Sequence, residues 1–196
     1  MMNLVLREAN LSGVDLTMVN FTGSDLSGAN LTNSRLRLGK VVNANLSNVD
    51  FTVARFERGG MFPAFTGADL TGANLSGLNL STSSSDGLLS EYLDLSGANL
   101  TNAKLINTRL LGVSLRNANL TNTDMSGAMI ADGDTRLYPA DLTNATLTNT
   151  NLTDAWVART DLRSIDLSSA NLTRTLLFDS NLGSQNLSET ALKGAN

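Results

Sequence analysis

The chain has 196 residues, which is enough for one domain or for one uninterrupted repeat array. It contains no Cys and no His, which excludes a disulfide framework, thiolate metal sites and the most common general base. Lys and Arg number 14 and Asp and Glu number 18, so the formal net charge of −4 argues against a direct nucleic-acid binder. With no apolar run approaching the ~18 residues of a membrane span and no signal-peptide pattern, we expect a cytoplasmic protein without membrane contact.

A five-residue unit repeats from the first residues to the last. It reads Ala-Asn/Asp-Leu-Ser/Thr-x, as in 9–13, 29–33 and 98–102. A large apolar residue forms the centre of each unit, and a mostly small residue stands two positions before it. We therefore interpret the chain as a repeat array and expect one fold to cover it.

Neither regular secondary structure has a period of five. A helix advances about 100° per residue, so the centres would spread around its surface. A strand alternates with period two, so successive centres would point to opposite faces. Asn, Asp, Ser, Gly and Thr flank the centres, and these residues favour turns. The pattern predicts a short extended piece and one turn in each repeat.

The centres run in steps of five from Leu6 to Met61, from Phe65 to Leu80, from Leu95 to Ile130 and from Leu137 to Leu192, which gives 36 repeats. Near 59–65 the phase shifts by one residue, and at 131–136 two residues are inserted. We expect 81–92 to be an excluded loop, because its in-phase centres would be serines with hydroxyls in a dry core. These irregular segments are either loops that recognise a partner or insertions that the corners of a rod tolerate without a function. In 81–92 the candidate recognition residues are Ser83, Asp86, Leu88 and Tyr92.

The tandem unit resembles the pentapeptide repeat family, whose consensus is Ala-Asp/Asn-Leu-x-x, over nearly all of residues 4–196. The resemblance implies an all-β fold, a right-handed quadrilateral β-helix with four repeats per coil. The 36 repeats would then make about nine coils in a single domain spanning 4–196. Stacked at about 4.8 Å per coil, the rod would be roughly 40 Å long.

With four repeats per coil, residues 20 apart share a face, and this predicts an exposed apolar stripe. The repeats centred on Leu137, Val157 and Leu177 would stack. Aromatic residues gathered on one face indicate a protein interface. Instead of an interface, these could be scattered surface apolar residues, or a local register change could bury Trp156. The expected stripe consists of Tyr138, Trp156, Leu176 and Phe178.

The same spacing predicts a basic patch around the repeats centred on Leu36 and Phe56. Its arginines could hold an acidic partner or a phosphate chain. The alternative is a solvated face that Glu57 partly neutralises. The patch consists of Arg35, Arg37, Lys40, Arg55 and Arg58.

Carboxylates recur directly before the centres and could imitate the phosphates of DNA, as the resemblance implies for family members that act on type II topoisomerases. Asn fills the same position more often, so turn chemistry explains them equally well. The Leu-rich chain also departs from the Phe-rich, Cys-containing repeats of quinolone-resistance proteins. The carboxylates are Asp15, Asp25, Asp50, Asp69, Asp94, Asp124, Asp141, Asp161 and Asp166.

We therefore expect no enzyme, no cofactor and no metal, but a rigid scaffold that binds another protein. It could stand alone or form the β-helix part of a larger protein. The alternative function is a DNA-mimicking modulator of DNA gyrase. Self-association through open coil ends is a further expectation, because repeats begin by residue 4 and unpaired coil edges favour strand pairing.

Overall fold

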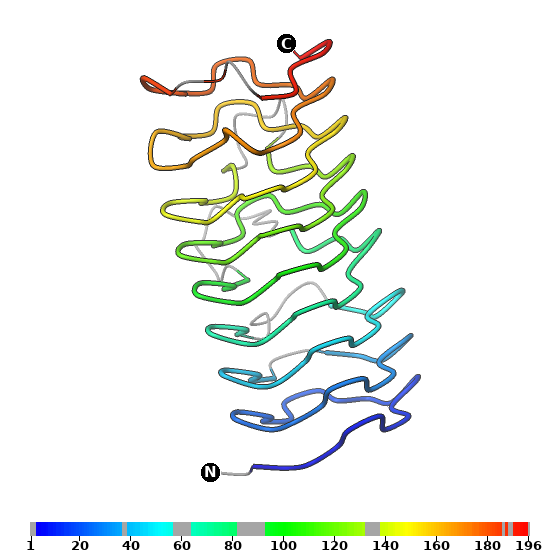
Figure 1. Ribbon diagram of the computed structural model, residues 1–196. Helices are drawn as coiled ribbons and strands as arrows, with labels where there is room; N and C mark the ends of the chain where they lie inside the picture. The colour runs from blue at the N-terminus through cyan, green and yellow to red at the C-terminus, as the bar shows by residue number, and fades with distance from the viewer. Residues whose placement is uncertain are drawn as a thin grey trace.

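The computed structural model describes residues 3–36, 39–56, 64–81, 93–131, 138–185, 187 and 190–195. The chain winds into a rod of stacked coils, with the N-terminus at one end and the C-terminus at the other (Figure 1). Within these ranges there is no helix, and backbone pairing consists of single-residue parallel bridges such as that of Asn10 with Asn30. No helix that could cross a membrane was found in the described part of the chain. The fold is the right-handed quadrilateral β-helix that the resemblance to the pentapeptide repeat family implies.

Most of the described repeats end in a four-residue turn. The carbonyl of Leu6 accepts the N–H of Ala9 at 3.1 Å, and the carbonyl of Leu26 accepts that of Ala29 at 2.9 Å. The third residue of the turn has a positive φ, as in a type II turn: 72° at Gly13 and 57° at Asn33. Gly and Asn adopt this conformation at little cost, which explains why they recur two positions after the centre.

The Asn or Asp before each centre holds the next turn in place. The Oδ1 of Asn30 accepts the backbone N–H of Thr32 at 3.0 Å and its hydroxyl at 2.8 Å. Asp69 and Thr71 repeat both bonds, at 3.0 and 2.6 Å. An amide and a carboxylate oxygen accept equally well here, so turn chemistry alone explains the Asn/Asp-x-Ser/Thr pattern.

The outward residues before the centres form ladders, which define four faces. In the regular part a coil takes 20 residues, the separation between Asn102 and Asn122, whose amides are hydrogen-bonded. Face I carries Asp25, Asn45, Asp69, Asn99, Asn119 and Thr146. Face II carries Asn10, Asn30, Asp50, Asn74, Lys104, Asp124, Asn151, Asn171 and Ala191. Face III carries Asp15, Arg35, Arg55, Asn79, Arg109, Met129, Trp156 and Leu176. Face IV carries Asn20, Lys40, Ala64, Asp94, Ser114, Asp141, Asp161 and Asn181.

The centres fill the axis of the rod. Leu100 and Leu105 are fully buried, and Phe51, Phe56 and Phe65 pack with ring centroids 6.2–6.3 Å apart. Several buried threonine hydroxyls bond to the coil before them, as Thr123 Oγ1 does when it donates to the carbonyl of Leu100 at 2.8 Å. The axis is therefore dry and close-packed along the described coils. Toward the ends, the centres Leu6, Leu11, Leu182 and Leu187 are only partly buried.

Three interruptions of the repeat fall at one corner, where face III passes to face IV. The described core goes directly from Phe56 to Phe65, from Leu80 to Leu95 and from Ile130 to Leu142. Coils that include these insertions are longer: 30 residues separate Asp69 from Asn99, and 27 separate Asp124 from Asn151. The extra residues are therefore all inserted at the same edge of the rod, between face III and face IV.

The register near 131–136 differs from the expectation. Ile130, not Leu137, lies against Val157, because the N–H of Ile130 bonds to the carbonyl of Trp156 at 2.9 Å. The insertion is therefore seven residues long and not two, since Ile130 and Leu142 are successive core positions. Met61 and Leu137, both expected as centres, lie outside the described residues.

On face IV the backbone ladder opens between Asp141 and Asp161. One coil earlier, Asp141 N–H bonds to Val113 O at 2.9 Å and Leu115 N–H to Asp141 O at 2.8 Å. No corresponding bond links the described coils of Asp141 and Asp161. At the adjoining corners serine hydroxyls take the place of backbone carbonyls, and Ser164 Oγ accepts Asn144 N–H at 3.2 Å.

Candidate functional site

The expected apolar stripe is only partly a column. Trp156 and Leu176 are bridged on face III, and the ring of Phe178 meets Trp156 edge to face at a centroid distance of 6.3 Å. Met129, which the sequence analysis missed, stands directly before Trp156 in the ladder. Tyr138 belongs instead to the corner beside face IV, where its carbonyl accepts Gly112 N–H at 2.8 Å. The spacing could not reveal Met129, because the insertion that separates it from Trp156 is seven residues long and not two.

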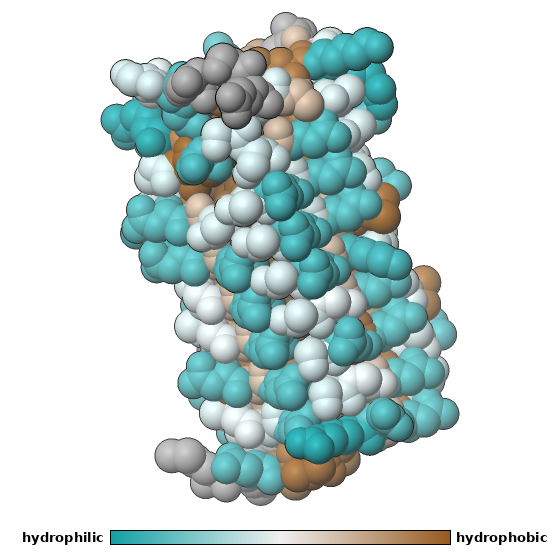
Figure 2. Space-filling view, in the orientation of Figure 1, coloured by the Kyte–Doolittle hydropathy of each residue, from teal (hydrophilic) through white to brown (hydrophobic). Residues whose placement is uncertain are grey.

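These side chains differ in exposure. Tyr138 is 66% exposed and Phe178 is 39% exposed, whereas Trp156 and Leu176 are partly buried. Trp156 Nε1 is buried and has no hydrogen-bond partner among the described residues. Figure 2 shows a surface that is mostly hydrophilic, with hydrophobic residues in separate spots. We call Met129, Tyr138, Trp156, Leu176 and Phe178 the aromatic patch.

The basic patch is only partly within the described residues. Arg35 and Arg55 are bridged neighbours on face III, and Lys40 follows on face IV. Arg37 and Arg58 lie outside the described residues, as do Ser83, Asp86, Leu88 and Tyr92 of the expected loop. Arg35 approaches Asp15 at 3.8 Å, and hydrogen bonds from Thr17, together with Arg35, lower the pKa of Asp15. Face III is thus cationic toward the N-terminus and apolar toward the C-terminus.

The nine periodic carboxylates do not form one continuous surface. They are distributed over all four faces. Face IV carries Asp94, Asp141 and Asp161, with Ser114 between the first two. Arginines neutralise several of them, as Arg7 does for Asp25 at 2.6 Å and Arg116 for Asp141 at 2.9 Å. In the described ranges no group of three or more carboxylates could hold a metal ion.

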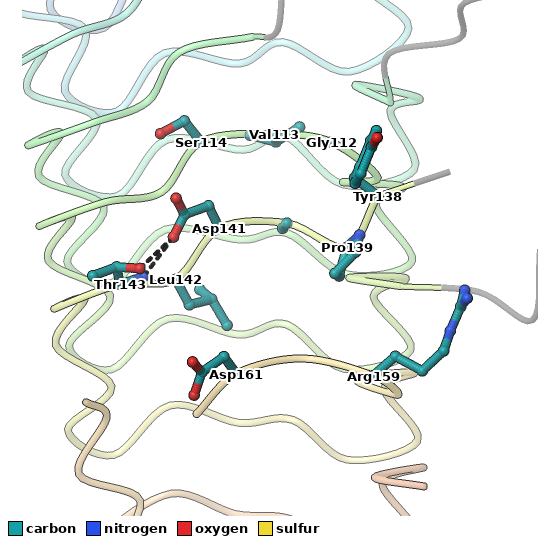
Figure 3. Close-up of a pocket in the computed structure, with 11 residues that line it drawn as sticks. Gly112, Val113, Ser114, Tyr138, Pro139, Asp141, Leu142, Thr143, Arg159 and Asp161 are labelled. Carbon is teal, nitrogen blue, oxygen red and sulfur yellow. Dashed lines mark hydrogen bonds between the residues drawn. The ribbon is translucent and has the colours of Figure 1, made fainter. Parts of the chain in front are cut away.

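A cavity of about 530 Å³ lies on face IV beside the corner that bears the insertions. Gly112, Val113 and Ser114 form one wall, residues 138–143 form the middle, and Arg159 and Asp161 close it. Figure 3 shows Asp141 and Asp161 on one side and Tyr138 and Arg159 on the other, with the Arg159 guanidinium directed away from both carboxylates. The cavity is therefore at the level where the Asp141–Asp161 ladder opens.

Both carboxylates in the cavity stay ionised at neutral pH. Hydrogen bonds from Arg163, first through its side chain and then through its backbone, lower the pKa of Asp161 to about 2. Burial alone would raise the pKa of Asp141, but hydrogen bonds from Thr143 and Arg116 hold it below its usual value. The ion pairs with Arg116 and Arg163 are largely exposed, so each contributes little free energy.

Several solved structures resemble the chain. HetL from the cyanobacterium Nostoc sp. strain PCC 7120 is 23% identical, with 98% of this chain and 89% of HetL covered and a TM-score of 0.41. QnrB1, a plasmid-mediated fluoroquinolone resistance protein, is 20% identical, with 95% and 76% covered and a TM-score of 0.39. A pentapeptide repeat protein from the thylakoid lumen of Arabidopsis thaliana is 24% identical, with 73% and 68% covered and a TM-score of 0.21. Comparison with curated protein sequences gave no significant match.

A family model for pentapeptide repeats matches the chain in 8 copies, over residues 2–38, 64–84, 94–128 and 135–163. These ranges cover more than half of the sequence and include the repeats that form all four faces. The chain belongs to the pentapeptide repeat family.

Proposed function

We propose that the protein is a non-enzymatic rigid scaffold that binds another protein through the aromatic patch. The observation that carries the proposal is the edge-to-face pair of Trp156 and Phe178, together with the exposed ring of Tyr138 at the same corner of the rod on another coil. Elsewhere the ladders of faces I and II consist mainly of Asn and Asp that bond to their own turns. Partly exposed aromatic residues on a polar rod are typical of binding hot spots.

The position of the insertions also supports a binding surface on this side of the rod. All three leave the corner between faces III and IV, and Tyr138 stands at the end of the third. Loops on a rigid scaffold commonly carry recognition, and the ladders give the edge between them a fixed geometry. The partner therefore contacts this edge, and faces I and II remain in solvent.

Two matched substitutions test the proposal. Phe178 and Thr148 each follow a core Leu at the first turn position, on faces III and I, and both are exposed. Tagged wild-type, Phe178→Glu and Thr148→Glu proteins would be purified from the native cells and their bound proteins quantified. We expect a partner protein to be recovered in stoichiometric amount with the wild type. Phe178→Glu should reduce the amount recovered by about tenfold, and Thr148→Glu should leave it unchanged. Equal recovery with both variants would refute the patch.

The alternative is a DNA-mimicking modulator of DNA gyrase, and the series Asp94, Asp141 and Asp161 on face IV favours it. The partial neutralisation by Arg116 and Arg163 weakens it. A gyrase supercoiling assay decides the matter, because replacing the three Asp by Asn keeps the turns and removes the charge. Inhibition that the triple variant loses would support the alternative. Self-association through the coil ends stays a prediction, which sedimentation at several concentrations would measure.

A further inference from the structure

The open ladder leaves peptide groups without partners on both walls of the cavity. In a regular coil the N–H of Leu142 would bond to Asp161 O, and the N–H of Asp161 to Ala140 O. Neither bond is present, and neither donor has another partner among the described residues. Unpaired backbone groups are costly to bury and are rare in proteins. The cavity therefore offers backbone donors and acceptors to a ligand that can pair with both.

The side chains of the cavity add charge and an aromatic edge. Asp141 Oδ1 accepts the Thr143 N–H and hydroxyl at 2.9 and 2.6 Å. Among the described residues, its Oδ2 is bonded only by the exposed Arg116. Asp161 is bonded by Arg163, whose side chain is 63% exposed. Both arginines can turn outward at small cost, because exposed pairs are weak. The Tyr138 ring on the opposite side of the cavity suits a cation or an alkyl stem.

We propose that this cavity binds a short extended segment of a partner protein, whose backbone pairs with the open ladder and whose lysine or arginine meets Asp141 and Asp161. The inference rests on the proposed function and names the chemistry of the partner. Alternating N–H and C=O groups are what an extended peptide supplies, as in binding by strand addition. A cavity of about 530 Å³ has room for a few residues of such a segment.

The test uses the full chain labelled with nitrogen-15 and a defined peptide. The probe is the acetylated, amidated peptide Thr-Val-Lys-Val-Thr, and the comparison peptides carry Glu or Leu in place of Lys. Amide shifts are followed during titration to millimolar concentrations. We expect saturable shifts at Leu142, Asp161 and Tyr138 with the Lys peptide and at least about tenfold weaker binding of the Glu peptide.

Matched variants make the result specific. Asn occupies the Asp position in many repeats and still accepts the turn N–H, so the double substitution Asp141→Asn and Asp161→Asn should fold normally. The double substitution should weaken binding of the Lys peptide by about tenfold, whereas Asp166→Asn on the next repeat should leave the binding unchanged. Asp166 is a suitable control because it makes the same turn bond, to Ser168.

Three outcomes would overturn the inference: no saturable shifts, equal binding of the Lys and Glu peptides, or full binding by the double variant. The proposed function has a separate readout. If the peptide fails to bind while Phe178→Glu still abolishes recovery of a native partner, this inference is wrong and the scaffold proposal stands. If Phe178→Glu changes nothing while the peptide binds at the open ladder, the aromatic patch is wrong and the cavity stands.

Discussion

Trp156 and Phe178 lie on adjacent coils of one edge and meet edge to face, with ring centroids 6.3 Å apart and planes at 66°. This pair joins the only Trp of the chain to a ring that is 39% exposed. The indole is therefore both part of the aromatic patch and a spectroscopic reporter of it.

Removing the Phe178 ring should loosen the indole. Phe178→Ala should lower the free energy of unfolding by about 1 kcal/mol, since aromatic pairs contribute about 0.5–1.5 kcal/mol. It should also increase quenching of Trp156 fluorescence by acrylamide. Thr148→Ala is the control, and an equal increase in quenching there would show that the effect is not local.

Val53 is strained in its turn. Its φ is 53°, in the left-handed region that β-branched residues avoid, and its side chain is 62% exposed. Val53→Asn should therefore raise the free energy of unfolding by about 1 kcal/mol, measured by urea denaturation. The reverse change at the equivalent turn position, Asn122→Val, should lower it by a similar amount. A destabilised Val53→Asn protein would contradict this account of the turn.

Buried hydroxyls hold successive coils together. Thr123 Oγ1 donates to Leu100 O at 2.8 Å in a fully buried site. Thr123→Val puts a methyl group against that oxygen and should cost about 1–2 kcal/mol of stability. Thr123→Ser keeps the hydroxyl and should cost less. Equal losses for the two variants in urea titrations would exclude the hydrogen bond as the cause.

The carboxylates predict a pH dependence in acid. Hydrogen bonds and nearby arginines depress the pKa values of Asp15, Asp25, Asp94, Asp141 and Asp161, the last to about 2. A depressed pKa in the folded state gives stability that is complete above the unfolded-state value, near 4, and is lost as the pH falls toward 2. Unfolding midpoints in urea should therefore fall between pH 5 and pH 2. Asp161→Asn should make the urea midpoint depend less on pH in this range. An unchanged pH dependence would contradict the role of Asp161.

The five-residue period was sufficient to predict one turn in each repeat, because each repeat carries the same turn chemistry. The right-handed quadrilateral β-helix was predicted from the resemblance to the pentapeptide repeat family. The Asn-x-Thr pattern at Asn30 and Thr32 specifies its own turn bonds locally, without reference to distant residues. The sharing of a face by Arg35 and Arg55 followed from the coil of four repeats that the resemblance implies.

The lengths of the insertions could not be predicted, because an insertion of two residues and one of seven restore the same phase. The choice between Leu137 and Ile130 under Val157 depends on how the chain closes the corner between faces III and IV, which is a tertiary question. The opening of the ladder at Asp141 and Asp161 has no pattern of its own, since both residues fit the consensus. The cavity and the place of Tyr138 therefore emerge only from the structure.

The central claim is that the edge between faces III and IV binds another protein while face I stays in solvent. Photo-crosslinking in the native cells tests it most directly, with benzoylphenylalanine placed at Phe178, at Tyr138 or at the matched control Thr148. The account predicts one discrete adduct, of the same mass, from Phe178 and Tyr138 and none from Thr148. Adducts of equal yield from Thr148, or none from Phe178 and Tyr138, would contradict it.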